Sequence, residues 1–248
     1  MTTSTTSSSP TGAVSTTTTA AAQPLAGKVV VLDPGHNEHN AAYPGEINRQ
    51  VAIGNGSKEC DTTGSETNAG YPEAAFNTDV ANRVAARLEA LGARVILTRD
   101  PATPWGPCIT ERAAIGNRAN ADAAISIHAD GGPPGGRGFH VIQPGLVAGY
   151  NDQIVGPSHR LALAIHDAYA AATGLPTATY IGSGGYDTRT DLGGLNLSVV
   201  PKVFIECGNL RNATDAALLS DAAFRDRVAD GIARGLTAFV TAVGSGSG

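Results

Sequence analysis

Two histidines and a glutamate stand at the ends of apolar runs that are typical of buried strands. These are His36 after the run 29–32, His128 after the run 123–127, and Glu206 after the run 203–205. In open α/β sheets, ligands bind at the carboxyl ends of the strands. We therefore expect the three side chains to meet at one edge of a sheet.

A fourth candidate, Glu73, stands at the start of a segment with helical periodicity, where the helix dipole favours a carboxylate. Two imidazoles and one carboxylate are a common ligand set of catalytic zinc, whose fourth position is left to water. These ligands also suit zinc better than calcium or copper(I). We therefore interpret His36, Glu73 and His128 as candidate ligands of Zn2+.

Glu206 is the candidate general base. An isolated buried charge is costly, so a glutamate at the end of a buried strand indicates a function more strongly than most single residues do. Bound zinc lowers the pKa of its water towards about 7. A carboxylate opposite that water can take its proton and pass it to a leaving amine. The four residues together predict metal-assisted hydrolysis of an amide.

Each of these residues also has a structural interpretation, which the sequence leaves open. A histidine after a strand is often a hydrogen-bonded structural group, and a glutamate at a helix start often only interacts with the dipole. His39 competes with His36 as a ligand, although its long polar loop favours contact with solvent or substrate. We expect Asp33 to accept a hydrogen bond from a ligand N–H, and Asn77 to support Glu73 in the same way.

The segments that must position these residues alternate between strand and helix patterns. Strands are predicted at 28–33, 93–98, 123–128, 139–142 and 202–207, and helices at 73–91, 109–120, 153–173 and 221–243. This alternation favours a single α/β domain. Arg112 is expected to tie a helix to a neighbouring loop, whereas His140 is interpreted as an ordinary strand residue.

Two of the three cysteines lie in loops between these elements. Cys60 belongs to the polar segment 37–71, whose length indicates a functional loop, and Cys108 lies in a Pro-rich loop. Such a pair suits a disulfide and an oxidising compartment. The alternative is two free thiols in a cytosolic protein. Cys207 lies within an apolar strand and is expected to be a buried, inert thiol.

The composition excludes several classes of protein. The 248 residues have a net charge of −5 and no basic block, which argues against nucleic acid as a partner. No apolar run approaches the roughly 18–20 residues of a membrane span. Residues 1–23 are Ser/Thr-rich, uncharged and lack the pattern of a signal peptide. We expect a disordered leader at 1–23, one domain at 24–243 and a Gly/Ser tail at 244–248.

Four separate motifs resemble those of a known family. They are Val-Leu-Asp-Pro-Gly-His at 31–36, Glu-x-x-x-Asn at 73–77, Ser-Ile-His-Ala at 126–129 and Pro-x-Val-Phe-Ile-Glu-x-Gly-x-x-x-Asn at 201–212. Together they resemble the zinc-dependent N-acetylmuramoyl-L-alanine amidases of the third amidase family, over about residues 27–240. The bare catalytic domain is most similar to the single-domain mycobacterial type.

This resemblance implies a peptidoglycan hydrolase with a twisted, mostly parallel sheet and helices on both faces. Such enzymes cut the amide between N-acetylmuramic acid and the L-alanine of the stem peptide. The family's zinc ligands carry over to His36, Glu73 and His128, and its catalytic carboxylate to Glu206. We expect a periplasmic or secreted protein that has a disulfide and whose signal peptide has been removed. Its substrates are expected to be peptidoglycan or muropeptide fragments, and the lack of a wall-binding module favours soluble fragments.

Two positions depart from the family's pattern. Asn37 replaces the usual glycine after the first histidine, and Asn209 replaces an aromatic or aliphatic residue, so we expect a more polar pocket wall near the base. Residues 145–160 do not resemble the inhibitory helix that some relatives carry. We therefore expect an open groove in a monomer that requires no activator.

Two other functions remain open at this point. A zinc peptidase or deacetylase that acts on another amide would use the same four groups, and only the substrate groove would separate it from the amidase. A non-catalytic wall-binding module is the third reading, but it would have no use for Glu206 as a base opposite the metal.

Overall fold

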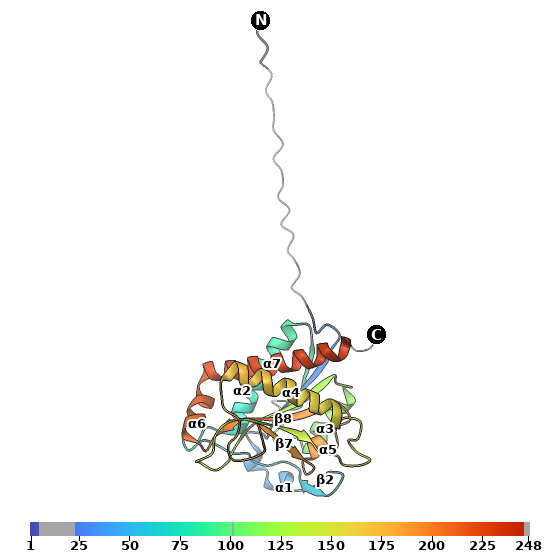
Figure 1. The fold of residues 1–248 in the computed structure, drawn as a ribbon, viewed down its shortest axis with the longest axis vertical. Helices are drawn as coiled ribbons and strands as arrows, with labels where there is room; N and C mark the ends of the chain where they lie inside the picture. Colours follow the sequence, from blue (N-terminus) through green and yellow to red (C-terminus); the bar gives the residue numbers. More distant parts are fainter. Residues whose placement is uncertain (5–22, 101, 246–248) are drawn as a thin grey trace.

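A six-stranded sheet forms the centre of the structure (Figure 1). The computed structural model describes residues 1–4, 23–100 and 102–245, so 5–22 of the predicted leader and 246–248 of the predicted tail lie outside the described residues. The strands, in their order across the sheet, are β4 (Arg94–Leu97), β1 (Val29–Pro34), β5 (Ala123–Asp130), β8 (Lys202–Asn209), β6 (His140–Pro144) and β7 (Tyr186–Arg189). The β6–β8 pair is antiparallel and the other four pairs are parallel, which confirms the predicted mostly parallel sheet.

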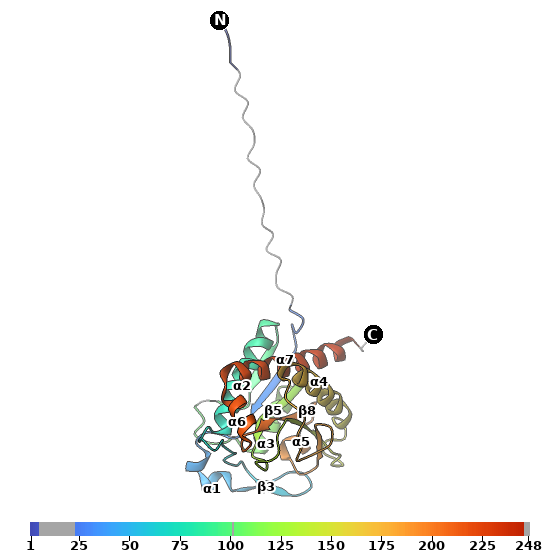
Figure 2. The same cartoon turned by 60° about the vertical axis from the view of Figure 1, so that its left-hand side comes forward.

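Helices cover both faces of this sheet, as the resemblance implied. The helices on one face are α2 (Glu73–Ala90), α4 (Val155–Thr173) and α7 (Ala222–Ser245), and those on the other are α3 (Ile109–Arg118) and α5 (Gly193–Asn196). Alternate strand residues such as Val30 and Ile125 join the larger apolar core. Helices α2, α4 and α7 lie over this face of the sheet (Figures 1 and 2). The neighbouring strand residues Val31 and Ala124 belong to a small apolar cluster on the α3 side. The α3 side of the sheet therefore has room for polar groups.

The predicted helices are present, but three shorter ones, α1 (Pro44–Ile47), α5 and α6, were not predicted. Helix α2 begins at Glu73, as predicted. The helix predicted at 221–243 is α7, and a separate helix, α6 (Ala213–Ser220), precedes it. Asn212 caps α6 by accepting hydrogen bonds from two backbone N–H groups of the first turn. The end of the chain therefore contains two helices where one was expected.

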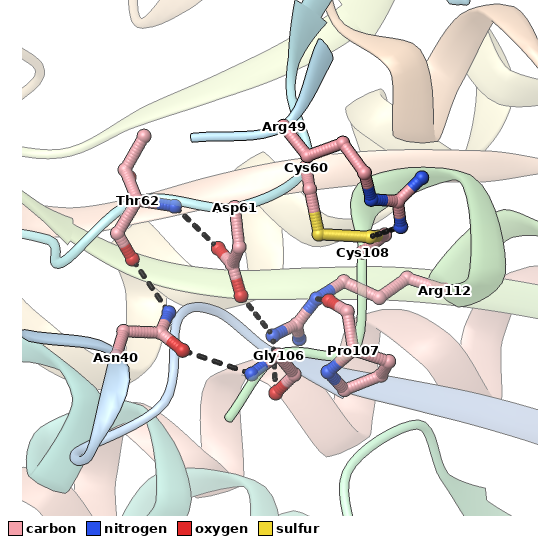
Figure 3. Close-up of a disulfide and its surroundings, with 9 residues drawn as sticks. All are labelled: Asn40, Arg49, Cys60, Asp61, Thr62, Gly106, Pro107, Cys108 and Arg112. Carbon is pink, nitrogen blue, oxygen red and sulfur yellow. Dashed lines mark hydrogen bonds and ion pairs between the residues drawn. A yellow bond between two sulfur atoms is a disulfide. The ribbon is translucent and has the colours of Figure 1, made fainter. Parts of the chain in front are cut away.

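The long segment 37–71 is folded rather than structureless. It contains η1 (Asn40–Ala42), α1 (Pro44–Ile47) and a hairpin of β2 (Gln50–Ala52) and β3 (Ser57–Glu59). A disulfide between Cys60 and Cys108 fastens the end of the hairpin to the start of α3, as predicted (Figure 3). Cys207 is free and buried, also as predicted.

Candidate metal centre and active site

The strands and one helix bring the four predicted residues to one edge of the sheet. His128 of β5 lies directly opposite Glu206 of β8, near the carboxyl ends of both strands. His36 follows the end of β1, and Glu73 is the first residue of α2. All four line a single cavity of about 340 Å³. Residues that are remote in sequence therefore share one site, although their roles remain predictions.

The carboxylate of Glu73 lies between the two histidine rings. Its Oε1 is 3.2 Å from Nε2 of His36 and 2.9 Å from Nδ1 of His128. One ligand atom from each residue lies within 4.8 Å of the other two. Glu73 is buried, and its Oε2 accepts a hydrogen bond from the Ser65 backbone N–H at 2.8 Å. These donors fit zinc, whereas His39 is exposed and does not join them.

The backbone approaches the candidate ligands closely. A Cβ atom on Gly35 would lie 2.1 Å from Cε1 of His128, and one on Gly64 would lie 2.7 Å from Cδ2 of His36. His36 itself has a φ of 59°, a left-handed conformation that costs a non-glycine residue about 1–3 kcal/mol. Strain of this kind persists mainly at functional sites. The local chain is therefore built around these side chains.

The carboxylate of Glu73 interacts electrostatically with both candidate histidine ligands. Burial opposes the imidazolium form of His36, but Glu73 and Asp61 raise the pKa of this histidine to about 10. Despite its burial, Glu73 has a lowered pKa because His36 and His128 stabilise its charged form. The site thus favours a positive charge beside Glu73. A metal ion would compete with the His36 proton for that position.

Glu206 faces the same cavity from β8. Burial, together with the negative charges of Glu73 and Asp130, raises the pKa of Glu206 well above its usual range. Its Oε2 is buried and has no hydrogen-bond partner among the described residues. Phe204, two residues earlier on the same face, stacks on the ring of His128 at 5.2 Å. A carboxyl group in this environment can accept a proton and later release it.

Asp33 does not support a ligand N–H, so that prediction is wrong. It is 2% exposed, and its carboxylate binds Nζ of Lys202 at 3.0 Å and Nη1 of Arg112 at 2.9 Å. The hydroxyl groups of Thr98 and Ser126 donate two further hydrogen bonds to it. Burial opposes ionisation of Asp33, but Lys202 and Arg112 hold its pKa well below the usual range. Asp33 therefore belongs to a buried ion network beneath the site.

Asp61 and Thr62 take the place that was predicted for Asp33. Nδ1 of His36 is 3.7 Å from Oδ1 of Asp61 and 3.1 Å from both the carbonyl and the hydroxyl oxygen of Thr62. Arg112 donates to the other oxygen of Asp61 at 2.9 Å (Figure 3) and to the carbonyl oxygen of His36 at 2.9 Å. Arg112 thus ties α3 to two loops, which confirms its predicted role. Its hydrogen bond to the carbonyl oxygen also holds the backbone of His36 in place.

Two asparagines that sequence analysis singled out have other roles than expected. Asn77 donates to the carbonyl oxygen of Gly35 at 3.1 Å rather than to a ligand side chain, so its predicted role is wrong. Asn209 is fully buried and donates to the carbonyl oxygens of Pro133 and Gly136, both at 2.8 Å. It does not line the cavity, and the expectation of a more polar wall at this position is wrong.

A second cavity of about 240 Å³ adjoins the first. The two share His36, Thr62, His128, Leu192 and Phe204. Lys58 and Glu59 of the hairpin line its outer part, together with the start of α5. Within the described part of the chain, the connection 145–154 between β6 and α4 lines neither cavity. The two cavities form a groove that leads away from the candidate ligands.

Comparison with known proteins identifies close relatives. A family model described as N-acetylmuramoyl-L-alanine amidase matches residues 30–238. The chain is 43% identical over 223 residues to the N-acetylmuramoyl-L-alanine amidase Rv3717 of Mycobacterium tuberculosis, and this match covers 89% of each chain. It also resembles the crystal structures of the amidase Ami1 from two mycobacteria. For Mycobacterium smegmatis the TM-score is 0.82 at 45% identity, covering 88% of this chain and 99% of that one. For Mycobacterium abscessus the TM-score is 0.80 at 44% identity, covering 87% and 99%.

Proposed function

The chain belongs to the N-acetylmuramoyl-L-alanine amidase family, and we propose that it hydrolyses the amide between N-acetylmuramic acid and the L-alanine of the peptidoglycan stem peptide. The observation that carries this proposal is the meeting of His36, Glu73, His128 and Glu206 in one cavity of a chain with these relatives. The groove beside the four residues offers room for the peptide or the sugar on either side of the amide.

We propose that His36, Glu73 and His128 hold a zinc ion. When bound, zinc polarises carbonyl groups and makes water more acidic. The chain's own contribution is orientation: the Ser65 backbone N–H donates to one oxygen of Glu73, and the carbonyl oxygen of Thr62 lies within hydrogen-bond distance of His36 Nδ1. Hydrogen bonds to the far side of a ligand fix its ring and raise its basicity.

Glu206 is proposed as the group that moves the proton. Its carboxylate takes a proton from the attacking water and then delivers it to the amine nitrogen of L-alanine, so that the product leaves as a neutral amine. The raised pKa of Glu206, which burial and the charges of Glu73 and Asp130 cause, favours the second of these transfers. The position of Glu206 opposite His128 supports this role.

The test combines a digest with a metal analysis. Glu206→Gln should lower turnover of purified muropeptides by about 10²–10⁴-fold while leaving the metal content unchanged, since a general base contributes on that order. His36→Ala should instead empty the metal site. Glu89→Gln, on the exposed side of α2, is the matched control and should change neither. Mass spectrometry should find a free stem peptide with an N-terminal alanine; cleavage of another amide would favour the zinc peptidase or deacetylase, and full activity of Glu206→Gln would remove the assigned base.

The substrate and the disulfide indicate where the enzyme acts. A peptidoglycan amidase acts on the cell wall, and the Cys60–Cys108 disulfide suits an oxidising compartment, so we propose a secreted or periplasmic protein. None of the described helices has the length and hydropathy to cross a membrane. Because 145–154 lines neither cavity and so does not block the site, we also propose that the enzyme is active without an activator. A requirement for a second protein in the digest would contradict this.

A further inference from the structure

Residues 60–65 run past two of the three candidate ligands. Thr62 lies beside His36, whose Nδ1 is 3.1 Å from both the carbonyl and the hydroxyl oxygen of this threonine. The backbone of Ser65 makes two hydrogen bonds with Glu73. Its N–H donates to Oε2 at 2.8 Å, and its carbonyl oxygen accepts from the Glu73 N–H at 2.9 Å. One short stretch of chain therefore supplies outer contacts to both candidate ligands.

Two glycines let this stretch pack tightly against the site. A Cβ atom on Gly64 would lie 2.7 Å from Cδ2 of His36 and 2.9 Å from Oε2 of Glu73. In the loop after β5, a Cβ atom on Gly131 would lie 2.5 Å from Oγ of Ser65. Side chains do not tolerate contacts this short without moving. A change in the path of residues 60–65 would therefore displace the candidate ligands.

This stretch has no regular structure that would fix its path. Residues 61–65, which all lie within the described range 23–100, belong to neither a helix nor a strand. Thr62, Thr63 and Gly64 are exposed. Segments with few buried contacts open more readily than the core of a protein. The position of the stretch must therefore come from the points at which it is anchored.

The anchor at its start is the first turn of α3. Cys60 and Asp61 are buried, and the disulfide joins Cys60 to Cys108, the residue before this helix (Figure 3). The N–H of Ile109 donates to the carbonyl oxygen of Cys60 at 2.7 Å, and Arg112 donates to Asp61 at 2.9 Å. The disulfide is the covalent one of these three links, and a covalent link restricts the chain most strongly.

We propose that residues 60–65 are a positioning segment of the metal centre, which the Cys60–Cys108 disulfide anchors and which keeps His36 and Glu73 in the geometry that binds the metal. This inference rests on the proposed role of these two residues as zinc ligands. Outer partners orient a ligand, and a ligand that loses them binds its metal more weakly. The disulfide thus contributes to metal affinity in addition to the stability of the fold.

The affinity for Zn2+ alone, measured by competition with a chromogenic chelator, tests the positioning segment. Gly64→Ala pushes the segment away from both ligands and should raise the Kd for Zn2+ by about 10–100-fold, the usual effect of disturbing an outer partner. Gly70→Ala is the matched control. Gly64 and Gly70 have similar φ values of 75° and 81°, but a Cβ atom on Gly70 would meet no described atom within 4 Å. Gly70→Ala should therefore bind Zn2+ as the wild type does.

A variant without the disulfide tests the anchor. The combined substitutions Cys60→Ser and Cys108→Ser should also raise the Kd for Zn2+ by about 10–100-fold, measured at a temperature at which the variant is folded. Ile165→Ala controls for lost stability. Ile165 is fully buried in the large core, where it packs near Gly235 of α7, so its truncation leaves a cavity far from the segment. Both changes should lower the thermal midpoint of the metal-free protein, but Ile165→Ala should keep the wild-type Kd.

The possible outcomes are distinct. A wild-type Kd in Gly64→Ala or in the folded double-serine variant would overturn the inference, and so would an equal rise in the matched control of either. If the double-serine variant does not fold, Gly64→Ala and Gly70→Ala decide. His36→Ala in the same titration shows which proposal fails. Wild-type affinity in His36→Ala rejects the metal site itself, whereas loss of Zn2+ from His36→Ala beside a wild-type Kd in Gly64→Ala rejects only this inference.

Discussion

Replacing Lys202 by methionine should destabilise the protein strongly. Lys202 is 1% exposed, and its Nζ lies 3.0 Å from the carboxylate of Asp33. Asp33 also binds Arg112, which in turn binds Asp61. The two cations and two anions of this network balance one another, and their side chains are only 2–5% exposed. Methionine fills a similar volume, so the substitution removes charge while disturbing the packing little.

The magnitude follows from the charge that remains. Without Lys202, the network carries one uncompensated negative charge on side chains that are at most 5% exposed. Breaking a buried ion pair by removing one partner costs about 3–5 kcal/mol of the free energy of unfolding. With a urea m-value of about 2–3 kcal/mol/M, the midpoint of denaturation should fall by roughly 1–2.5 M. Urea titrations followed by circular dichroism measure this directly.

The hairpin provides a control with the same chemistry at the surface. Nζ of Lys58 also lies 3.0 Å from a carboxylate oxygen, that of Asp191, but these side chains are 35% and 49% exposed. Exposed pairs contribute about 0–1 kcal/mol, so Lys58→Met should move the midpoint little. If Lys202→Met and Lys58→Met cost the same small amount, the argument that burial makes this network critical is refuted.

The pH dependence of the difference provides a second check. The pKa of folded Asp33 lies well below its ordinary 3.8, so its contribution to stability is present above pH 3.8 and is lost as the pH falls through the folded value. Removing Lys202 raises the folded pKa of Asp33, because one of its two cations is gone. The loss of free energy of unfolding caused by Lys202→Met should therefore be largest near pH 7. It should shrink as the pH falls, once Asp33 in the variant takes up a proton.

Two further predictions concern the disulfide and the metal. Replacing Cys60 and Cys108 by serine should lower the free energy of unfolding by about 3–4 kcal/mol, because the bond joins residues 48 positions apart; urea titration measures this, and Cys207→Ser, which breaks no disulfide, is the reference for loss of a thiol. In protein stripped of metal, burial lowers the pKa of His36, but Glu73 and Asp61 raise it to about 10. The stability that protonated His36 contributes to the fold is therefore complete below pH 6.5 and is lost as the pH rises through about 10. Thermal scans should show the midpoint of the stripped protein falling across this range more steeply than that of the loaded protein, and equal slopes would contradict the assignment.

The residues at strand ends could be predicted because sheet geometry is regular. The carboxyl ends of adjacent parallel strands lie side by side, so His36, His128 and Glu206 had to come together once their strands were recognised. Glu73 could be predicted because α2 has a clear helical period and starts at this residue. Strand and helix periodicities are local properties, and the sequence displays them directly.

The supporting residues could not be predicted because they depend on contacts between distant segments. Asp61 reaches His36 only because 37–71 folds back and the disulfide holds the neighbouring residue, Cys60. Lys202 looks like the lysine of an exposed strand end, and nothing local shows that Asp33 lies behind it. The sequence did carry one unused signal, since Asn212 three residues before Asp215 is a typical start of a helix, here α6.

The alternation of side chains along the strands explains why the candidate active site and the buried ion network lie on the same face of the sheet. On β8 the side chains of Lys202, Phe204 and Glu206 point to the α3 side, while Val203 and Ile205 fill the apolar core. Side chains alternate between the two faces of a strand, so every second residue from Glu206 lies on the same face as this candidate base. The ion network therefore fills the layer beneath the site, where apolar packing is thin. Substitutions there should change stability and ligand orientation together, whereas those on the core face should change stability alone.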